Sequence, residues 1–253
     1  VLLVVGGPQY RVGSHRQFLL LSRKLAEAGI PAFRFDCRGM GDSEGEPAGF
    51  DAISDQIEAA IDAFVATNTK VRRIVLWGLC DAAAAAMIYG FQDNRVISMV
   101  LLNPWVRTPE GQAQTLVKRH YAQRVGSIEF WTRLLTGRVA VISALQSLIR
   151  NVRQSLGVGA RGAAEDNDVQ PPFVERMRQG LDRFDGTSLF IISGDDLTAA
   201  EIEELIRRSK GCKTLVWREG KQVVRIDDAN HTFSSTAWRN NVEQETISWV
   251  LSR

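Results

Sequence analysis

The sequence predicts an α/β fold: a mostly parallel sheet flanked by helices, with one helical insertion. The chain of 253 residues is long enough for one large domain, and its hydrophobic fraction of 45% and charged fraction of 24% are ordinary for a globular protein. Strand-like and helix-like segments alternate up to residue 104, which is typical of a parallel sheet with helices on both faces. The alternation then stops and resumes only near the C-terminus, so we expect an insertion between.

The elements of the first part follow from two kinds of pattern. Runs of β-branched residues and leucine predict buried strands, whereas apolar residues three and four apart predict helices with one packed face. Ser14 is the expected N-cap of the first helix, and Gly29 its stop. The predicted strands are 1–5, 31–38, 72–77 and 96–104, and the predicted helices are 14–28, 51–67 and 80–90.

Residues 105–186 contain no convincing strand and form the predicted helical cap or lid, with helix-like stretches at 111–124 and 127–156. The strand pattern resumes after this insertion. It predicts strands at 187–194, 213–219 and 222–228, and helices at 198–209 and 235–251. The core is therefore expected to consist of 1–104 and 187–253.

Composition argues against several function classes. Lys and Arg number 31 and Asp and Glu 29, a net charge of +2 without a long basic run, so we expect no nucleic-acid partner. No apolar stretch reaches about 18 residues, so we expect no membrane span. Three widely separated cysteines without a CxxC pair predict a reducing, cytoplasmic location and no zinc site. No phosphate-loop motif occurs, and we expect neither a cofactor nor a metal. Because the chain begins inside a strand-like run, we expect that residues precede Val1.

Functional groups of open α/β sheets gather at the carboxyl ends of the strands. The strand at 72–77 ends in Gly78-Leu79-Cys80-Asp81-Ala82, directly before a run of alanines. Small residues two before and two after a nucleophile let the strand and helix backbones cross closely, and Gly78 and Ala82 meet that need. The helix N-terminus favours a thiolate at this position. Cys80 is therefore the candidate nucleophile, and the alternative is a small buried apolar residue.

Two later strand ends supply candidate partners for Cys80. The strand at 187–194 is followed by Asp195 and Asp196, and the strand at 222–228 by a loop with His231. His231 would take the proton of Cys80 or hold it in a thiolate–imidazolium pair, and the acid would orient the ring. The residues alone leave both aspartates open, and Asp196 could instead cap the helix that follows it.

An acyl intermediate needs two hydrogen-bond donors for its oxyanion. The backbone N–H of Asp81, the residue after the nucleophile, is the first candidate. The second is expected from "GGPQ" at 6–9, where proline has no N–H, so Gly7 is preferred and Gln9 comes next. His15 and Trp105 are possible substrate-binding residues; for His15 an ordinary place in the first helical turn is the alternative.

The motifs together resemble the α/β-hydrolase superfamily. G-x-C-x-A is similar to its G-x-S-x-G nucleophile elbow, and the chain order nucleophile, acid, histidine is the same. Several stretches resemble a narrower group, the exosortase A system-associated hydrolase 1 family: "GGPQYRVGSHRQF", "FRFDCRGMGDSEG", "GLCDAAAAA", "LLNPWVRT", "SGDDLTAAE" and "DDANHTFSS". This resemblance implies a bacterial α/β-hydrolase linked to PEP-CTERM protein sorting and exopolysaccharide production. It also implies that the acid is Asp196, directly before "LTA".

The cysteine nucleophile, and the absence of the histidine that often precedes the "GGP" loop, depart from the commoner superfamily pattern. We therefore expect a hydrolase that cleaves the ester or thioester bond of a small-molecule acyl substrate through an acyl-Cys80 intermediate. Two alternatives stay open. One is an acyltransferase on the same site, and the other is a non-catalytic protein that binds a partner through 105–186. The oligomeric state and the substrate are left open.

Overall fold

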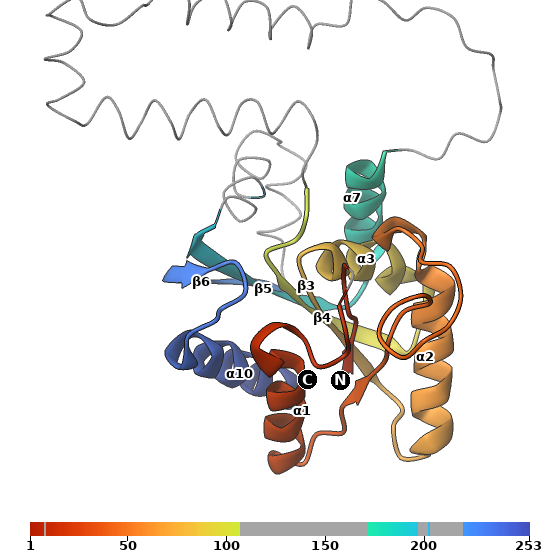
Figure 1. Cartoon of the computed structure of the whole chain (residues 1–253), viewed down its shortest axis with the longest axis horizontal. Coiled ribbons are helices and arrows are strands. Elements are labelled where there is room, and N and C mark those ends of the chain that lie inside the picture. Colours follow the sequence, from red (N-terminus) through yellow and green to blue (C-terminus); the bar gives the residue numbers. More distant parts are fainter. Residues whose placement is uncertain (8, 107–171, 197–201, 203–219) are drawn as a thin grey trace, which may run out of the picture. The chain divides into compact units, whose positions relative to one another are not determined.

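The computed structural model describes residues 1–7, 9–106, 172–196, 202 and 220–253. These residues form a six-stranded sheet with the order β2-β1-β3-β4-β5-β6, in which all neighbouring strands are parallel (Figure 1). This confirms the predicted mostly parallel sheet. The strands are β1 (Leu2–Leu3), β2 (Phe33–Arg34), β3 (Ile74–Leu79), β4 (Val96–Leu102), β5 (Thr187–Asp195) and β6 (Lys221–Asn230).

Helices cover both faces of the sheet, as predicted. The side chains of α1 (Gln17–Glu27) and α10 (Thr236–Leu251) pack on one face, and those of α2 (Ser54–Thr67), α3 (Asp81–Tyr89) and α7 (Phe173–Arg183) pack on the other. Successive strand residues alternate between the two cores, because strand side chains point to opposite faces in turn. Three short 3₁₀ turns complete the described elements: η1 (Ser14–Arg16), η2 (Phe50–Ala52) and η3 (Gly90–Gln92).

The predicted starts of the first and last helices fare differently. The last helix was expected from 235, and Ser235 is the N-cap of α10, because its hydroxyl accepts a hydrogen bond from the Trp238 N–H at 3.2 Å. Ser14 does not cap α1, which begins only at Gln17. The reason is local: His15 and Arg16 have φ values of 53° and 61°, so the chain cannot continue as a right-handed helix through them.

The compact unit that contains the sheet consists of 1–106 and 171–253. It therefore takes in α7, which lies inside the stretch that the strand-free pattern assigned to the insertion. Gly180 brings α7 against α3 so closely that a Cβ at this position would overlap the carbonyl oxygen of Met87. The remaining predicted elements at 111–124, 127–156 and 213–219, and all but Ile202 of the predicted helix at 198–209, lie outside the described residues.

The strand order places a switch point between β1 and β3. The chain adds β2 on one side of β1 and then crosses to place β3 on the other side, next to β1. In open parallel sheets, ligands bind at the carboxyl ends of the strands where the order reverses. The segments that leave β1 and β3 at this point are Gly6-Gly7 and Leu79-Cys80, which are the candidate oxyanion loop and the candidate nucleophile. Within the described residues, no helix is both long and apolar enough to cross a membrane.

Candidate active site

Cys80 lies in a strained turn between β3 and α3. Its φ of 61° and ψ of −118° are unusual for a residue with a side chain, and they are typical of a nucleophile held in a sharp strand-to-helix turn. Close packing enforces the turn, since a Cβ at Gly78 would lie 2.6 Å from the carbonyl carbon of Ala82. The end of β4 fixes the Cys80 backbone from both sides: its N–H donates to Leu102 at 2.8 Å, and its carbonyl accepts from Trp105 at 3.1 Å.

His231 and Asp196 form a hydrogen-bonded pair at the ends of β6 and β5. Nδ1 of His231 lies 2.8 Å from Oδ2 of Asp196, and the Asp196 side chain is only 7% exposed. The hydrogen bond to Asp196 and a second one to Cys80 raise the pKa of His231 to about 10, against the opposing effect of burial. Both partners therefore favour the protonated ring, which carries a proton on each nitrogen.

The two adjacent aspartates have different surroundings. Asp195 is the last residue of β5; it is exposed and in register with Asn230 of β6. Asp196 follows it, and Asp196 carries the bond to His231. Consecutive side chains of an extended chain point in opposite directions, so only one of the two can face the histidine.

Asn103 is a member of this site that the sequence patterns did not single out. It is fully buried, and it has a φ of 41° directly after β4. Its Oδ1 accepts the Ser193 N–H at 2.9 Å, and its Nδ2 donates to the Ser193 hydroxyl at 2.9 Å and to the His231 carbonyl at 3.1 Å. Asn103 thus fastens the histidine loop to the ends of β4 and β5. The only sequence signal was a polar residue at the end of a continuous apolar strand, in "LLNP".

The two preferred oxyanion donors lie beside the Asp81 carboxylate. This carboxylate accepts a hydrogen bond from the Ala82 N–H at 2.9 Å; a Cβ on Gly6 would overlap it, and a Cβ on Gly7 would lie 3.5 Å from its Oδ2. Burial raises the pKa of this carboxyl group, and the backbone N–H groups of Ala82, Gly7 and Asp81 oppose that rise. The Gln9 N–H donates to the Gly7 carbonyl at 2.8 Å instead. Gly7 and Asp81 therefore form a small anion-binding position beside Cys80, whereas the Gln9 N–H is directed away from it.

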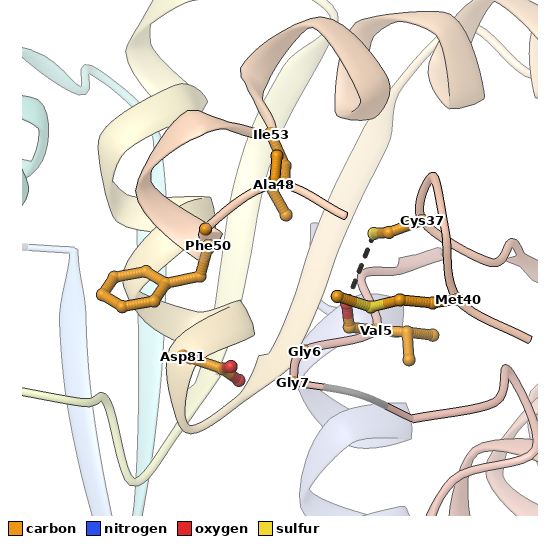
Figure 2. A pocket seen from close by; sticks show the side chains of 10 residues that line it. Val5, Gly6, Gly7, Cys37, Met40, Ala48, Phe50, Ile53 and Asp81 are labelled. Atoms are coloured by element: carbon orange, nitrogen blue, oxygen red, sulfur yellow. Dashed lines mark hydrogen bonds between the residues drawn. The ribbon is translucent and has the colours of Figure 1, made fainter. Parts of the chain in front are cut away.

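A pocket of about 260 Å³ adjoins this position (Figure 2). Its walls are apolar apart from the Asp81 carboxylate, whose oxygens point towards Gly6 and Gly7. Cys37 also lines it, and its thiol donates to the Val5 carbonyl at 3.5 Å; burial raises the pKa of this thiol to about 11, so it stays protonated at neutral pH. The complete lining is Val5, Gly6, Gly7, Cys37, Met40, Ala48, Gly49, Phe50, Ile53 and Asp81.

The two candidate substrate-binding residues lie outside this pocket lining. His15 is exposed in η1, and the half-buried Trp105 donates its backbone N–H to the Cys80 carbonyl. No cluster of three or more His, Cys, Asp or Glu side chains suited to a metal ion occurs among the residues with described positions.

The geometry of an elbow, an anion-binding position and a paired histidine agrees with the family comparison. The model of the alpha/beta hydrolase family matches residues 1–239. The chain belongs to the alpha/beta hydrolase family. No curated protein sequence matches it significantly.

Solved structures resemble this alpha/beta hydrolase over nearly its whole length. The esterase Pf2001 of Pyrococcus furiosus has a TM-score of 0.64 at 14% identity, and the match covers 99% of this chain and 80% of that one. Est1E of Butyrivibrio proteoclasticus, solved with ferulic acid bound, has a TM-score of 0.58 at 15% identity, with coverage of 99% and 87%. A monoacylglycerol lipase of Paleococcus ferrophilus has a TM-score of 0.56 at 15% identity, with coverage of 99% and 93%. At these identities, the resemblance shows that the fold is shared.

Proposed function

We propose that this alpha/beta hydrolase cleaves an ester or thioester bond of a small acyl substrate through a covalent acyl-Cys80 intermediate. The observation that carries the proposal is the His231 ring, which is bonded to the Asp196 carboxylate at 2.8 Å and whose pKa is also raised by Cys80 in its strained turn. This is the arrangement of nucleophile, base and orienting acid that acyl transfer uses on several unrelated folds. The narrower exosortase-associated assignment, with its link to exopolysaccharide production, stays a prediction.

The charge state of His231 decides the form of the mechanism. A ring with a pKa near 10 is already protonated at neutral pH, so it cannot accept another proton from a thiol. The proposal therefore uses the second of the two forms that the sequence allowed, in which His231 holds Cys80 in a thiolate–imidazolium pair. Because Nδ1 is bonded to Asp196, Nε2 is the nitrogen that faces Cys80 and the substrate.

The reaction then proceeds in two balanced steps. The thiolate attacks the acyl carbon, the bond from that carbon to the leaving oxygen or sulfur breaks, and Nε2 gives its proton to the leaving atom. Neutral His231 next takes a proton from water while the water oxygen attacks the thioester, which releases the acid and restores the ion pair. During both attacks, the Gly7 and Asp81 N–H groups would hold the oxyanion.

Alkylation of the free protein tests the pair without a substrate. We would treat the protein with iodoacetamide from about pH 5 to 10 and follow the Cys80 peptide by mass, in the wild type and in His231→Ala. A free thiol has a pKa of about 8.5, so it is almost entirely protonated at about pH 6. An activated thiolate is more abundant but less nucleophilic, so we expect wild-type labelling at about pH 6 to be at least tenfold faster than in the variant.

The neighbouring aspartates provide a matched control. Asp196→Asn should slow labelling of Cys80 at about pH 6 several-fold, because the histidine loses its anionic partner, and Asp195→Asn should have a much smaller effect.

Incubation with short thioesters should then add an acyl mass to Cys80, and Cys80→Ala should remove that adduct. Wild-type labelling that follows an ordinary thiol, together with no acyl adduct, would contradict covalent catalysis and favour a binding role.

A further inference from the structure

The Asp81 carboxylate lies beside the two N–H groups that the reaction's oxyanion would need. It accepts the Ala82 N–H at 2.9 Å, its Oδ2 lies 3.5 Å from the place of a Cβ on Gly7, and the Gly7 and Asp81 N–H groups favour its charged form. The fit is tight, because a Cβ at Gly6 would overlap the Asp81 carboxylate. Asp81 is the residue directly after Cys80, so its side chain cannot lie far from the acyl carbon of any substrate bound to the sulfur.

This arrangement opposes the hydrolysis of an ordinary apolar acyl group. A substrate carbonyl would have to displace the carboxylate from its donors, and the negative charge that develops on the oxyanion would then lie beside a second negative charge. Like charges in a poorly solvated site repel strongly. His231 favours the charged form of Asp81, but its ring is held by Asp196. Among the residues with described positions, no Lys or Arg forms an ion pair with Asp81.

The pocket provides a second position for the Asp81 carboxylate. Its volume of about 260 Å³ lies just below the ~300–1,000 Å³ of typical small-molecule sites, so it suits a short acyl group. Its other walls, including Val5, Phe50 and Ile53, are apolar (Figure 2). A cationic group in such surroundings would have the Asp81 carboxylate as its one charged partner in the lining, and a charge-assisted hydrogen bond there is strong.

We propose that Asp81 is a specificity-determining residue that selects short acyl groups carrying an ammonium, and that pairing with this ammonium draws its carboxylate away from the Gly7 and Asp81 N–H groups. The bound substrate thereby frees the two donors for its own oxyanion. The ammonium has to lie within a few bonds of the acyl carbon, because Asp81 directly follows the nucleophile in the chain. This inference rests on the proposed acyl-Cys80 chemistry and adds a substrate class to it.

An isosteric pair of substrates tests the selection. In the N-acetylcysteamine thioesters of butyrate and 3-aminopropionate, an ammonium replaces a methyl group of the same size at the same position. We expect the wild type at about pH 7.5 to hydrolyse the 3-aminopropionyl thioester with at least tenfold higher kcat/KM. Asp81→Asn keeps an oxygen for the Ala82 N–H but removes the charge, so it should lower kcat/KM for the aminoacyl thioester and raise it for the butyryl thioester.

Two further measurements test whether the charge of Asp81 is the cause of the preference. The 3-hydroxypropionyl thioester has a neutral donor, and it should rank between the other two if charge drives the selection. Asp55→Asn removes an exposed carboxylate that pairs with Arg38 at 2.8 Å, and it should leave the preference unchanged. Equal rates on both thioesters in the wild type, or an equal change of both rates in Asp81→Asn, would overturn the role of Asp81 while leaving the acyl-Cys80 mechanism intact. The absence of any acyl-Cys80 adduct would overturn both.

Discussion

The two halves of the candidate site are held in place by different forces. The elbow half, around Cys80, depends on close backbone packing: Gly78 and the alanines of α3 leave no room for larger side chains. The histidine half, around His231 and Asp196, depends on polar bonds between the ends of β4, β5 and β6. Packing positions the nucleophile through steric exclusion, whereas hydrogen bonds position the histidine through groups that can also titrate.

This difference predicts which kind of change should disrupt each half of the site. An added methyl group should break the elbow half, because the interior has no free volume to absorb it. The loss of a donor should break the histidine half, because its buried partners would then lack hydrogen bonds. A change of pH should affect mainly the histidine half, since the elbow half is held in place by contacts between uncharged backbone and alanine groups.

The largest expected effect is that of Gly78→Ala on the elbow. The added Cβ would meet the Ala82 backbone at 2.6 Å, and a backbone contact cannot move aside as a flexible side chain would. We expect a loss of about 3 kcal/mol of unfolding free energy in urea and a clear loss of Cys80 alkylation at about pH 6. Gly29→Ala is the matched control: φ is +75° there, but a Cβ meets nothing within 4 Å. It should cost about 1 kcal/mol of backbone strain and leave the labelling of Cys80 unchanged.

A smaller effect is expected for Asn103→Ala in the histidine half. The substitution leaves the buried Ser193 N–H without its acceptor and frees the His231 carbonyl, so we expect a loss of about 2 kcal/mol of unfolding free energy. The Cys80 labelling profile should also shift towards that of an ordinary thiol, because the histidine loop loses its anchor. Ser193→Ala removes only the hydroxyl partner and should change both quantities much less. A stability loss with an unaltered labelling profile would limit Asn103 to a structural role.

The elbow half could be predicted from the sequence because its determinants are local. Gly78, Cys80 and Ala82 lie within five residues, and their small sizes alone indicate that a strand backbone and a helix backbone cross there. The alternation of strands and helices likewise fixed the fold class, because burial on both faces leaves continuous apolar runs.

The histidine half was predictable only in part. The chain order pointed to His231 and to a pair of aspartates. The side of β5 on which each aspartate lies depends on the register between β5 and β6, and this register cannot be read from the sequence. Asn103 joins groups 90 and 128 residues further along the chain, so no local pattern marks it. The start of α1 was predicted too early because Ser14 fits the composition of an N-cap, whereas nothing in the composition indicates the positive φ values of the next two residues.

The smallest expected effect is a pH dependence of stability that belongs to His231. Its pKa is raised from 6.5 to about 10 in the folded protein, so the folded state binds its proton more tightly than the unfolded state does. The resulting stabilisation is fully present below about pH 6.5 and is lost as the pH rises towards 10. The ring is 34% exposed, so solvent screens its ion pair and we expect a contribution of about 1 kcal/mol. Urea unfolding under reducing conditions should therefore show that the wild type loses this stability between about pH 6.5 and 9.5, whereas His231→Gln does not. Parallel curves for the two proteins would mean that the imidazolium is not held by Asp196 and Cys80, and the histidine half would then be positioned by Asn103 and the strand ends alone.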